Sequence, residues 1–147
     1  MIEIQMMRED HVKQVAELEK VCFSAPWSEN SIRSELTNPL SLWLVAVEEN
    51  KLLGYIGSQS VMDEADMMNV AVSPDCRRRG IARRLVEALV QALAQRQVSS
   101  LTLEVRATNE PAKALYEQLS FIQVGRRPNY YRNPKEDALI LRKEWHT

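Results

Sequence analysis

The most regular hydrophobic pattern in the chain lies within residues 81–93. Apolar side chains recur there every four residues, and two valines widen the stripe; the set is Ile81, Leu85, Val86, Leu89, Val90 and Leu93. This spacing places the side chains on one side of an α-helix, so the segment predicts a long amphipathic helix packed against a core. A weaker pattern of the same period over residues 9–22, which includes Glu19, predicts another helix with Asp10 as its capping residue.

Short apolar runs bounded by polar or turn-forming residues predict the strands. Two runs, residues 42–47 and 52–57, flank a short polar turn and predict a hairpin. The remaining predicted strands cover residues 2–6, 67–72, 101–105, 121–124 and 138–141. Two short helices are also predicted, one capped by Ser28 and one with Pro111 near its first turn. The order β-α-α-β-β-β-α-β-α-β-β predicts a mixed α/β (α+β) fold with helices on both faces of one sheet.

The composition is ordinary for a soluble globular domain and excludes several classes of protein. The chain has 147 residues, 45% hydrophobic and 27% charged, without a visible linker or repeat, so we expect a single domain over residues 1–147. A formal net charge of −1 provides no global attraction to nucleic acid or membrane. Neither a run of about 20 apolar residues nor a signal peptide is visible. We therefore expect a cytoplasmic protein without a direct nucleic-acid or membrane partner.

Two kinds of chemistry are not supported by the sequence. Cys22 and Cys76 lie far apart without a Cys-x-x-Cys pair, so we expect neither a metal site nor a disulfide scaffold. No nucleophile elbow and no Cys-His signature is present either. Any group transfer is therefore expected to occur by direct attack in a ternary complex and not through a covalent acyl-enzyme.

A basic loop that contains a glycine separates the strand 67–72 from the long helix. The first amides of a helix lack partners within the helix and lie at its positive end, so they bind anions. Gly80 permits close approach of a ligand and Ala82 leaves room above the first turn. Positive charge is added by Arg77, Arg78, Arg79, Arg83 and Arg84. An isolated pattern of this kind is more often an ordinary helix start, but its position between strand and helix favours a phosphate or pyrophosphate site.

Two motifs in this chain resemble those of a known family. Residues 77–82, Arg-Arg-Arg-Gly-Ile-Ala, resemble the acetyl-CoA motif R/Q-x-x-G-x-G/A of the GCN5-related N-acetyltransferases (GNAT). Residues 109–121 resemble the family's N-x-x-A-x-x-x-Y-x-x-x-G-F segment, with Ser120 in place of the usual glycine. The motifs occur in the expected order and at the expected separation. The resemblance covers nearly the whole chain and implies the GNAT fold, a central sheet of about seven strands, acetyl-CoA as cosubstrate and N-acetyltransferase activity.

Within that family, the chain resembles the bacterial group that acetylates the N-terminal alanine of small-subunit ribosomal protein number eighteen. The similar segments are residues 25–28, 63–65, 69–72, 103–106 and 127–131. The implied acceptor is therefore a protein N-terminus. Two alternatives stay open: an acetyltransferase for a small amine such as a polyamine, an amino acid or an aminoglycoside, and a non-catalytic acyl-CoA-binding module.

The resemblance also implies where acetyl-CoA binds. The pantetheine arm would lie along Val70, Ala71 and Val72 like an added strand, with the Val70 N–H polarising the thioester oxygen. Asn109 would bind the pantetheine, although a helix cap explains this residue equally well from sequence alone. The pyrophosphate would rest on the backbone amides of Arg78, Arg79, Gly80, Ile81, Ala82 and Arg83.

The implied catalytic residues are Glu104 as the base and Tyr116 as the acid that protonates the coenzyme A thiolate. Alternation places Glu104 on the face opposite Leu103, which is equally typical of a solvent-facing residue on a one-sided sheet. A tyrosine like Tyr116, among apolar helix positions, is more often a core residue. Acceptor contacts are expected from Trp27, Asn69 and Tyr131, and the acidic Glu64 and Asp66 are expected near the cleft. Trp27 and Tyr131 lie in aromatic clusters that we expect in loops, where anchoring is the alternative role.

Overall fold

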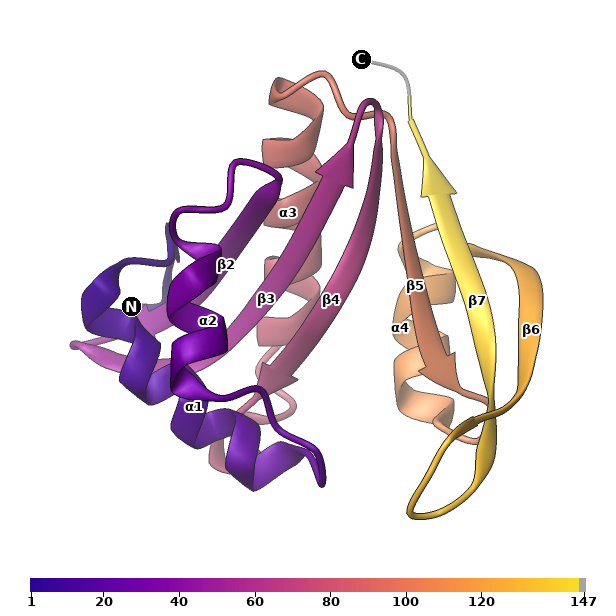
Figure 1. Ribbon diagram of the computed structural model, residues 1–147, viewed down its shortest axis with the longest axis horizontal. Helices are drawn as coiled ribbons and strands as arrows, with labels where there is room; N and C mark the ends of the chain where they lie inside the picture. Colours follow the sequence, from indigo (N-terminus) through magenta and orange to yellow (C-terminus); the bar gives the residue numbers. More distant parts are fainter. Residues whose placement is uncertain (146–147) are drawn as a thin grey trace.

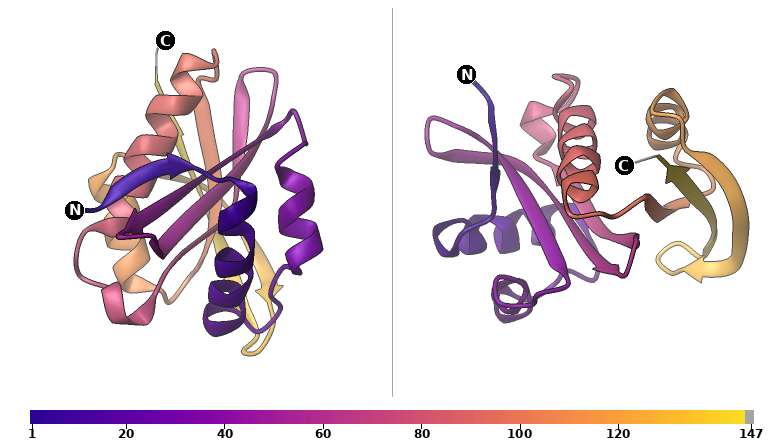
Figure 2. Two further views of the ribbon diagram at one scale, coloured as in Figure 1. Left: turned by 90° about the vertical axis from the view of Figure 1, so that its left-hand side faces the viewer. Right: turned by 90° about the horizontal axis from the view of Figure 1, so that it is seen from above.

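A single seven-stranded sheet, in the order β1-β2-β3-β4-β5-β7-β6, runs through residues 1–145, the part of the chain that the computed structural model describes (Figure 1). The strands are β1 Glu3–Met6, β2 Ser41–Glu48, β3 Lys51–Val61, β4 Glu64–Val72, β5 Ser100–Arg106, β6 Ile122–Tyr131 and β7 Glu136–Glu144. The helices are α1 Glu9–Cys22, α2 Glu29–Glu35, α3 Ile81–Gln95 and α4 Glu110–Gln118, with a short 3-10 turn at Pro74–Cys76. Helices α1 and α2 lie on one face of the sheet and α3 and α4 on the other (Figure 2). The predicted fold class and element order are confirmed.

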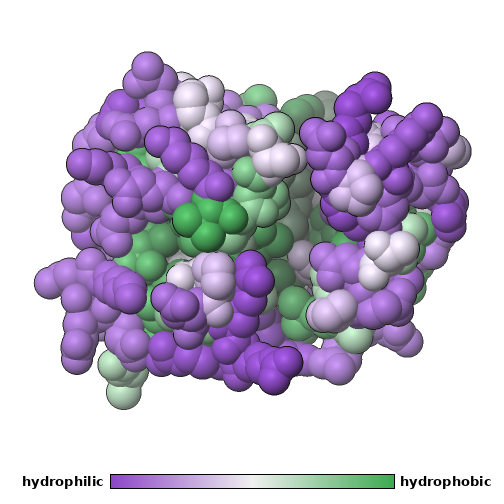
Figure 3. All heavy atoms as spheres, turned by 90° about the horizontal axis from the view of Figure 1, so that it is seen from below, coloured by the Kyte–Doolittle hydropathy of each residue, from purple (hydrophilic) through white to green (hydrophobic). Residues whose placement is uncertain are grey.

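Strands β4 and β5 separate soon after they begin. They run parallel and pair at three positions, from Glu64 opposite Ser100 to Asp66 opposite Thr102. Beyond these positions the two strands diverge, and the sheet opens into a V at their carboxyl ends (Figure 1). Figure 3 views that end of the molecule and shows it hollowed between two halves, with apolar surface along the hollow. The unpaired backbone groups on the facing edges of β4 and β5 therefore line a cleft and do not bond to each other.

The predicted stripe of the long helix is buried as expected. Ile81, Leu85, Leu89 and Leu93 are at most 2% exposed and belong to the hydrophobic cluster between α3, α4 and the sheet. A second cluster fills the space between α1, α2 and the opposite face, where Trp43 lies close against the backbone of β3. A Cβ atom at Gly57 would lie 2.3 Å from the Trp43 ring, so only glycine permits this approach.

Some boundaries differ from the sequence prediction. Helix α1 begins at Glu9, and its N-terminus is closed by the Arg8 N–H donating to His11 Nδ1 at 2.9 Å, not by Asp10. A histidine three positions into the helix thus takes the role that Glu or Gln has in a capping box. Strand β6 extends to Tyr131, so the predicted tyrosine loop is part of the strand. The error arose because the exposed residues of β6 continue the pairing with β7 without an apolar pattern.

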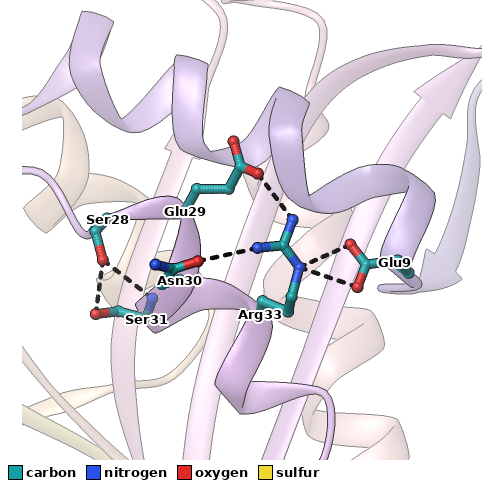
Figure 4. Close-up of polar contacts among 6 residues, drawn as sticks. All are labelled: Glu9, Ser28, Glu29, Asn30, Ser31 and Arg33. Carbon is teal, nitrogen blue, oxygen red and sulfur yellow. Dashed lines mark hydrogen bonds and ion pairs between the residues drawn. The ribbon is translucent and has the colours of Figure 1, made fainter.

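A polar cluster joins α2 to α1 (Figure 4). Ser28 Oγ accepts the Ser31 N–H at 3.0 Å, which confirms the predicted cap of α2. Arg33 on α2 pairs with Glu9 at 3.0 Å and with Glu29 at 2.8 Å. Exposed pairs of this kind contribute at most about 1 kcal/mol each. Together they fix α2, and with it the preceding loop of residues 23–28, against the first helix.

Candidate active site

The wall of the cleft on β4 is irregular at its middle. Met67 pairs with Ser58 and Asn69 with Gly57, so Met68 is an extra residue in β4 and forms a β-bulge. A bulge turns the strand locally and changes the direction of its amides, and such features are frequent beside active sites. Residues 67–70 are half-buried even though they lie in the middle of the sheet, because β5 has diverged from them.

The predicted pantetheine-binding residues line this wall. Val70 and Val72 are half-buried, and Ala71 is buried. Ala71 therefore presents its backbone and not its side chain. Main-chain groups at an unpaired strand edge bind an extended ligand as they would bind another strand. The geometry fits the predicted role of Val70–Val72.

The start of α3 has the backbone conformation of an anion site. Gly80 precedes the helix with φ +74°, and Arg78 two residues earlier also has a positive φ of 69°. A Cβ atom at Gly80 would meet no atom of residues 1–145 within 4 Å, so open space lies directly above the first amides of the helix. Ile81 is 2% exposed and therefore contributes its amide alone. Glycine is required here by the backbone angle, and the space fits a pyrophosphate.

Several of the arginines in this loop and in the first turn of α3 form contacts within the protein. Arg79 pairs with Glu48 at 3.1 Å, which joins the loop to the end of β2. Arg83 donates to Gln118 Oε1 at 2.7 Å and joins α3 to α4, and Arg84 donates to the carbonyl of Ile2 at 3.1 Å. Part of the positive charge around this helix start therefore has a structural role. These three side chains already have partners in the protein, so the backbone amides are the donors at this helix start that remain available to an anion.

Glu104 occupies β5 in the orientation that its alternation predicts. Its neighbours Leu103 and Val105 are buried on the opposite face, whereas the Glu104 side chain is 31% exposed. The carboxylate forms an ion pair with Arg127 on β6, with 3.0 Å between Oε2 and Nε. Glu104 therefore has access both to solvent and to the neighbouring strand.

Tyr116 faces the cleft from α4. Its ring is buried against Phe121, and its hydroxyl lies 3.9 Å from Met67 Sδ on β4. Burial raises the pKa of Tyr116 to about 12, with a smaller contribution from Tyr131. Burial and then the negative charge of Glu104 raise the pKa of Tyr131 to about 12 as well. The charge of Glu104 therefore acts on the phenol of Tyr131, which in turn acts weakly on Tyr116.

Asn109 caps α4. Its side-chain oxygen accepts the Ala112 N–H at 3.2 Å, so the capping alternative is confirmed. The carboxamide nitrogen is not used by this bond and can donate to a ligand. The structure thus fits a double role for Asn109, of which the pantetheine contact stays a prediction.

A buried carboxylate that the sequence pattern did not mark as functional connects α1 to the β4 wall of the cleft. Glu19 on α1 is fully buried and accepts hydrogen bonds from the Trp27 N–H at 2.7 Å, from Asn69 Nδ2 at 2.6 Å and from the Tyr55 hydroxyl. Burial raises the pKa of Glu19, while the bonds from Trp27 and Asn69 oppose the rise. The signal was present in the sequence, since Glu19 stands within the apolar stripe of the first predicted helix.

The predicted acceptor-binding residues have different settings. The Trp27 ring packs edge-on against Trp43, with 5.4 Å between centroids, which is the anchoring role considered above. The Asn69 side chain is directed at Glu19, and the half-buried Tyr131 ring lies 4.4 Å from the Arg106 guanidinium.

The two acidic residues expected near the cleft also differ. Glu64 lies at the closed end of the V, where it pairs with Arg142 at 3.0 Å. It is therefore not a cleft residue. Asp66 stands at the last paired position, where β4 and β5 separate.

Within residues 1–145, no three His, Cys, Asp or Glu side chains gather in a way that could hold a metal ion. The helices of the same part of the chain are too short or too polar to cross a bilayer.

Comparisons with known proteins agree with this geometry. Residues 12–121 match the profile of the acetyltransferase (GNAT) family. The chain is 39% identical over 126 residues to the [ribosomal protein bS18]-alanine N-acetyltransferase of Escherichia coli (strain K12), with 84% of each chain covered. It is 40% identical over 128 residues to the protein of that name from Salmonella typhimurium (strain LT2), with 85% of each covered. The crystal structure of the ribosomal-protein-S18-alanine N-acetyltransferase from Escherichia coli superposes with a TM-score of 0.91 at 34% identity, covering 100% of this chain and 96% of that one. With a profile match over most of its length and relatives at this level of identity, the chain belongs to the acetyltransferase (GNAT) family.

Proposed function

We propose that this protein transfers the acetyl group of acetyl-CoA to the N-terminal alanine of ribosomal protein bS18, in the cytoplasm. The observation that carries the proposal is the cleft between β4 and β5, which presents an accessible carboxylate, Glu104, and a buried phenol, Tyr116, beside an unpaired strand edge. The names of relatives that share about two fifths of their residues with the chain over most of its length support the choice of acceptor.

Acetyl-CoA fits the cleft in one orientation. The amides at the start of α3 and the space above Gly80 suit the pyrophosphate. The edge of β4 at residues 70–72 suits the amide groups of the pantetheine arm. This orientation directs the thioester toward the bulge at Met68 and toward the Tyr116 hydroxyl, which already contacts Met67.

In the proposed reaction, Glu104 removes a proton from the α-ammonium of the acceptor, directly or through water. A free α-amine has a reference pKa of about 7.7–8.0, so this deprotonation requires little free energy near neutral pH. The neutral nitrogen then attacks the thioester carbon, and the Val70 N–H stabilises the negative charge that develops on the carbonyl oxygen. The carbon–sulfur bond breaks, and Tyr116 donates its proton to the departing thiolate. The nitrogen loses its second proton as the amide forms, and this proton passes through water to the tyrosinate and restores Tyr116.

The raised pKa of Tyr116 suits an acid that must be protonated when the acceptor attacks. With a pKa of about 12, the phenol keeps its proton at neutral pH. A thiol in water has a lower pKa, about 8.5, which would make the transfer unfavourable. Burial also disfavours a thiolate, however, so a sulfur that leaves beside Tyr116 in the same apolar pocket becomes a stronger base.

Coenzyme A release tests the proposal directly. The assay uses acetyl-CoA and a six-residue peptide beginning Ala-Arg, with the same peptide blocked at its N-terminus as the control. Turnover of the free-amine peptide alone supports acetylation of a protein N-terminus. Turnover of spermidine without turnover of the peptide would instead indicate the small-amine alternative.

The Tyr116→Phe variant separates an enzyme from a binding module. It keeps the aromatic packing on Phe121 and removes only the hydroxyl. We expect unchanged acetyl-CoA binding and a kcat that is lower by about 10²-fold, the lower end of the range for general acid catalysis. An unchanged kcat would refute the assigned role.

A further inference from the structure

A cation, Arg127, lies beside the candidate base Glu104, and its role there rests on the proposed function. Arg127 Nε lies 3.0 Å from Glu104 Oε2, one of the two oxygens that the base can offer to an ammonium group. Both the arginine and the acceptor α-ammonium are cations, and both are attracted to the same negative charge. They therefore compete for one carboxylate.

The register of the C-terminal strands explains how Arg127 reaches Glu104. Ala138 on β7 pairs with Arg127 on β6 and with Arg106 on β5, so these three residues share one face of the sheet. Glu104 lies on the same face two residues before Arg106. Because Ala138 is small and lies between the two strands, the long Arg127 side chain can extend across β7 to the carboxylate.

The other guanidinium on this face is held differently. Arg106 pairs with Glu136 at 3.3 Å, donates to the carbonyls of Arg132 and Pro134, and stacks on Tyr131. Arg127 has a looser setting: its side chain is 57% exposed and lies 5.7 Å from the centroid of the Tyr130 ring. Arg127 can therefore leave Glu104 without disrupting the β6–β7 hairpin. Arg106, in contrast, could not move without losing the contacts that tie it to this hairpin.

We propose that Arg127 is a positioning residue that holds the Glu104 carboxylate until the acceptor ammonium replaces it. The exchange keeps one positive charge beside the carboxylate throughout, so Glu104 is not left unpaired in the cleft. When the ammonium proton passes to Glu104, the carboxyl becomes neutral and loses its attraction for either cation. Loss of that proton to water regenerates the carboxylate, and Arg127 returns to it.

The exchange predicts a change in acceptor binding that a structural role would not produce. In Arg127→Gln the acceptor no longer displaces a cation, so its KM falls by up to about fivefold, the factor that corresponds to an exposed ion pair. The same KM becomes more sensitive to salt, because a net charge attraction replaces an exchange of equal charges. Binding of the N-terminally acetylated peptide, which has no ammonium group, stays unchanged.

Arg126→Gln is the matched control. It removes the same charge from the adjacent position of β6, where the side chain pairs with Asp137 at 2.8 Å and not with Glu104. We expect the KM of the free-amine peptide and its salt dependence to stay at the wild-type values. An equal fall in KM in both variants, or an unchanged or higher KM in Arg127→Gln, would overturn the proposal.

A second measurement does not depend on the identity of the protein substrate. Titration of the wild-type protein with alaninamide should shift the NMR signal of the Arg127 Nε–H, and N-acetylalaninamide should not. The Arg126 signal serves as the internal reference. If the ribosomal peptide is not turned over but alaninamide shifts the Arg127 signal, the proposed acceptor is wrong and the exchange stands. An Arg127 signal that ignores alaninamide while the peptide is acetylated refutes the exchange alone.

Discussion

The two sides of the cleft each carry a carboxylate, and the two are held in opposite ways. Glu19, on the side formed by α1 and β1–β4, is fully buried and receives three hydrogen bonds from fixed donors. Glu104, on the side formed by β5–β7 and α4, is partly exposed and faces one flexible arginine. A carboxylate whose acceptor positions are occupied by rigid donors supports structure, whereas one with an exchangeable partner is available for chemistry.

The difference extends to the surroundings of each carboxylate. Around Glu19, the Trp27 ring meets Trp43 edge-on at 5.4 Å, and the Trp43 ring stacks on Tyr55 at 5.8 Å between centroids. Around Glu104, the contacts come from charged and phenolic side chains along the β6–β7 hairpin. The N-terminal side is therefore built as a rigid frame, and the C-terminal side presents the groups that change partners.

The largest expected effect is on catalysis and comes from the exposed carboxylate. In Glu104→Gln we expect kcat to fall by about 10²–10⁴-fold, the range for loss of a general base, with little change in stability. Steady-state kinetics with the Ala-Arg peptide and a urea unfolding curve measure the two quantities. Glu64→Gln, which removes a carboxylate at the closed end of the V, is the control and should keep the wild-type kcat. A Glu104→Gln variant with normal kcat would show that Glu104 is not the base.

The buried carboxylate should show the reverse behaviour. Glu19→Ala leaves the donors of Trp27, Tyr55 and Asn69 without their acceptor, which we expect to lower the free energy of unfolding by about 3 kcal/mol or more. Glu19→Gln retains an acceptor oxygen and should lose less. Urea titration followed by tryptophan fluorescence measures both. Unchanged stability in Glu19→Ala would show that the hydrogen bonds to Glu19 do not stabilise this side of the cleft.

Gly80 combines a structural role with a proposed binding role at the start of α3. Alanine in its left-handed conformation should cost about 1–2 kcal/mol of stability, and the added Cβ should also weaken acetyl-CoA binding by occupying the space above the helix amides. Calorimetric titration measures the affinity. Arg78→Gly is the matched substitution, since it removes a side chain from a residue at φ 69° and should raise stability. Equal acetyl-CoA affinity in wild type and Gly80→Ala would contradict the assigned anion site.

A smaller effect is expected from His11, whose protonation makes the free energy of unfolding depend on pH. Burial lowers the pKa of His11 because it disfavours the charged ring, and the neutral ring accepts the Arg8 N–H at the start of α1. The folded protein therefore binds this proton less readily than the unfolded chain does. The resulting stability is fully present above the unfolded pKa of about 6.5 and is lost as the pH falls below it.

His11→Gln keeps an acceptor at the same helix position and removes the titration. The loss of unfolding free energy between pH 7.5 and pH 5.5 should therefore be smaller in this variant than in the wild type. Glu19 titrates in both proteins, so the difference between them isolates His11. Identical pH dependence would show that the ring does not control the cap.

Local features of the molecule were predictable from the sequence because they depend on neighbouring residues. The caps at Ser28 and Asn109, the buried stripe of α3 and the outward orientation of Glu104 all follow from spacings of two to four positions. The anion site at Gly80 is equally local, since a strand, a glycine and a helix start occur in sequence. These predictions required no knowledge of which strands pair.

The remaining features depend on contacts between distant segments. The bulge at Met68 exists only in the register with β3, and Asn69 meets Glu19 from 50 positions away along the chain. The pairing of Glu104 with Arg127 likewise requires that β7 lie between their strands. Hydrophobic period carries no information about such registers, which explains why the partners of Glu19 and Arg127 were not identified.

In the proposed binding mode, main-chain amides at β4 and at the start of α3 hold the cosubstrate, and this has a consequence for how the site can change during evolution. A peptide N–H belongs to every residue except proline, so replacement of one side chain by another does not delete the donor. Substitutions in these segments are therefore limited by the backbone conformation that the site requires. Glycine is needed where φ is positive, proline is excluded, and a small side chain is needed over the first helical turn. Alanine scanning across residues 70–82 will consequently understate the contribution of this segment, because it removes the side chains and leaves the binding groups in place.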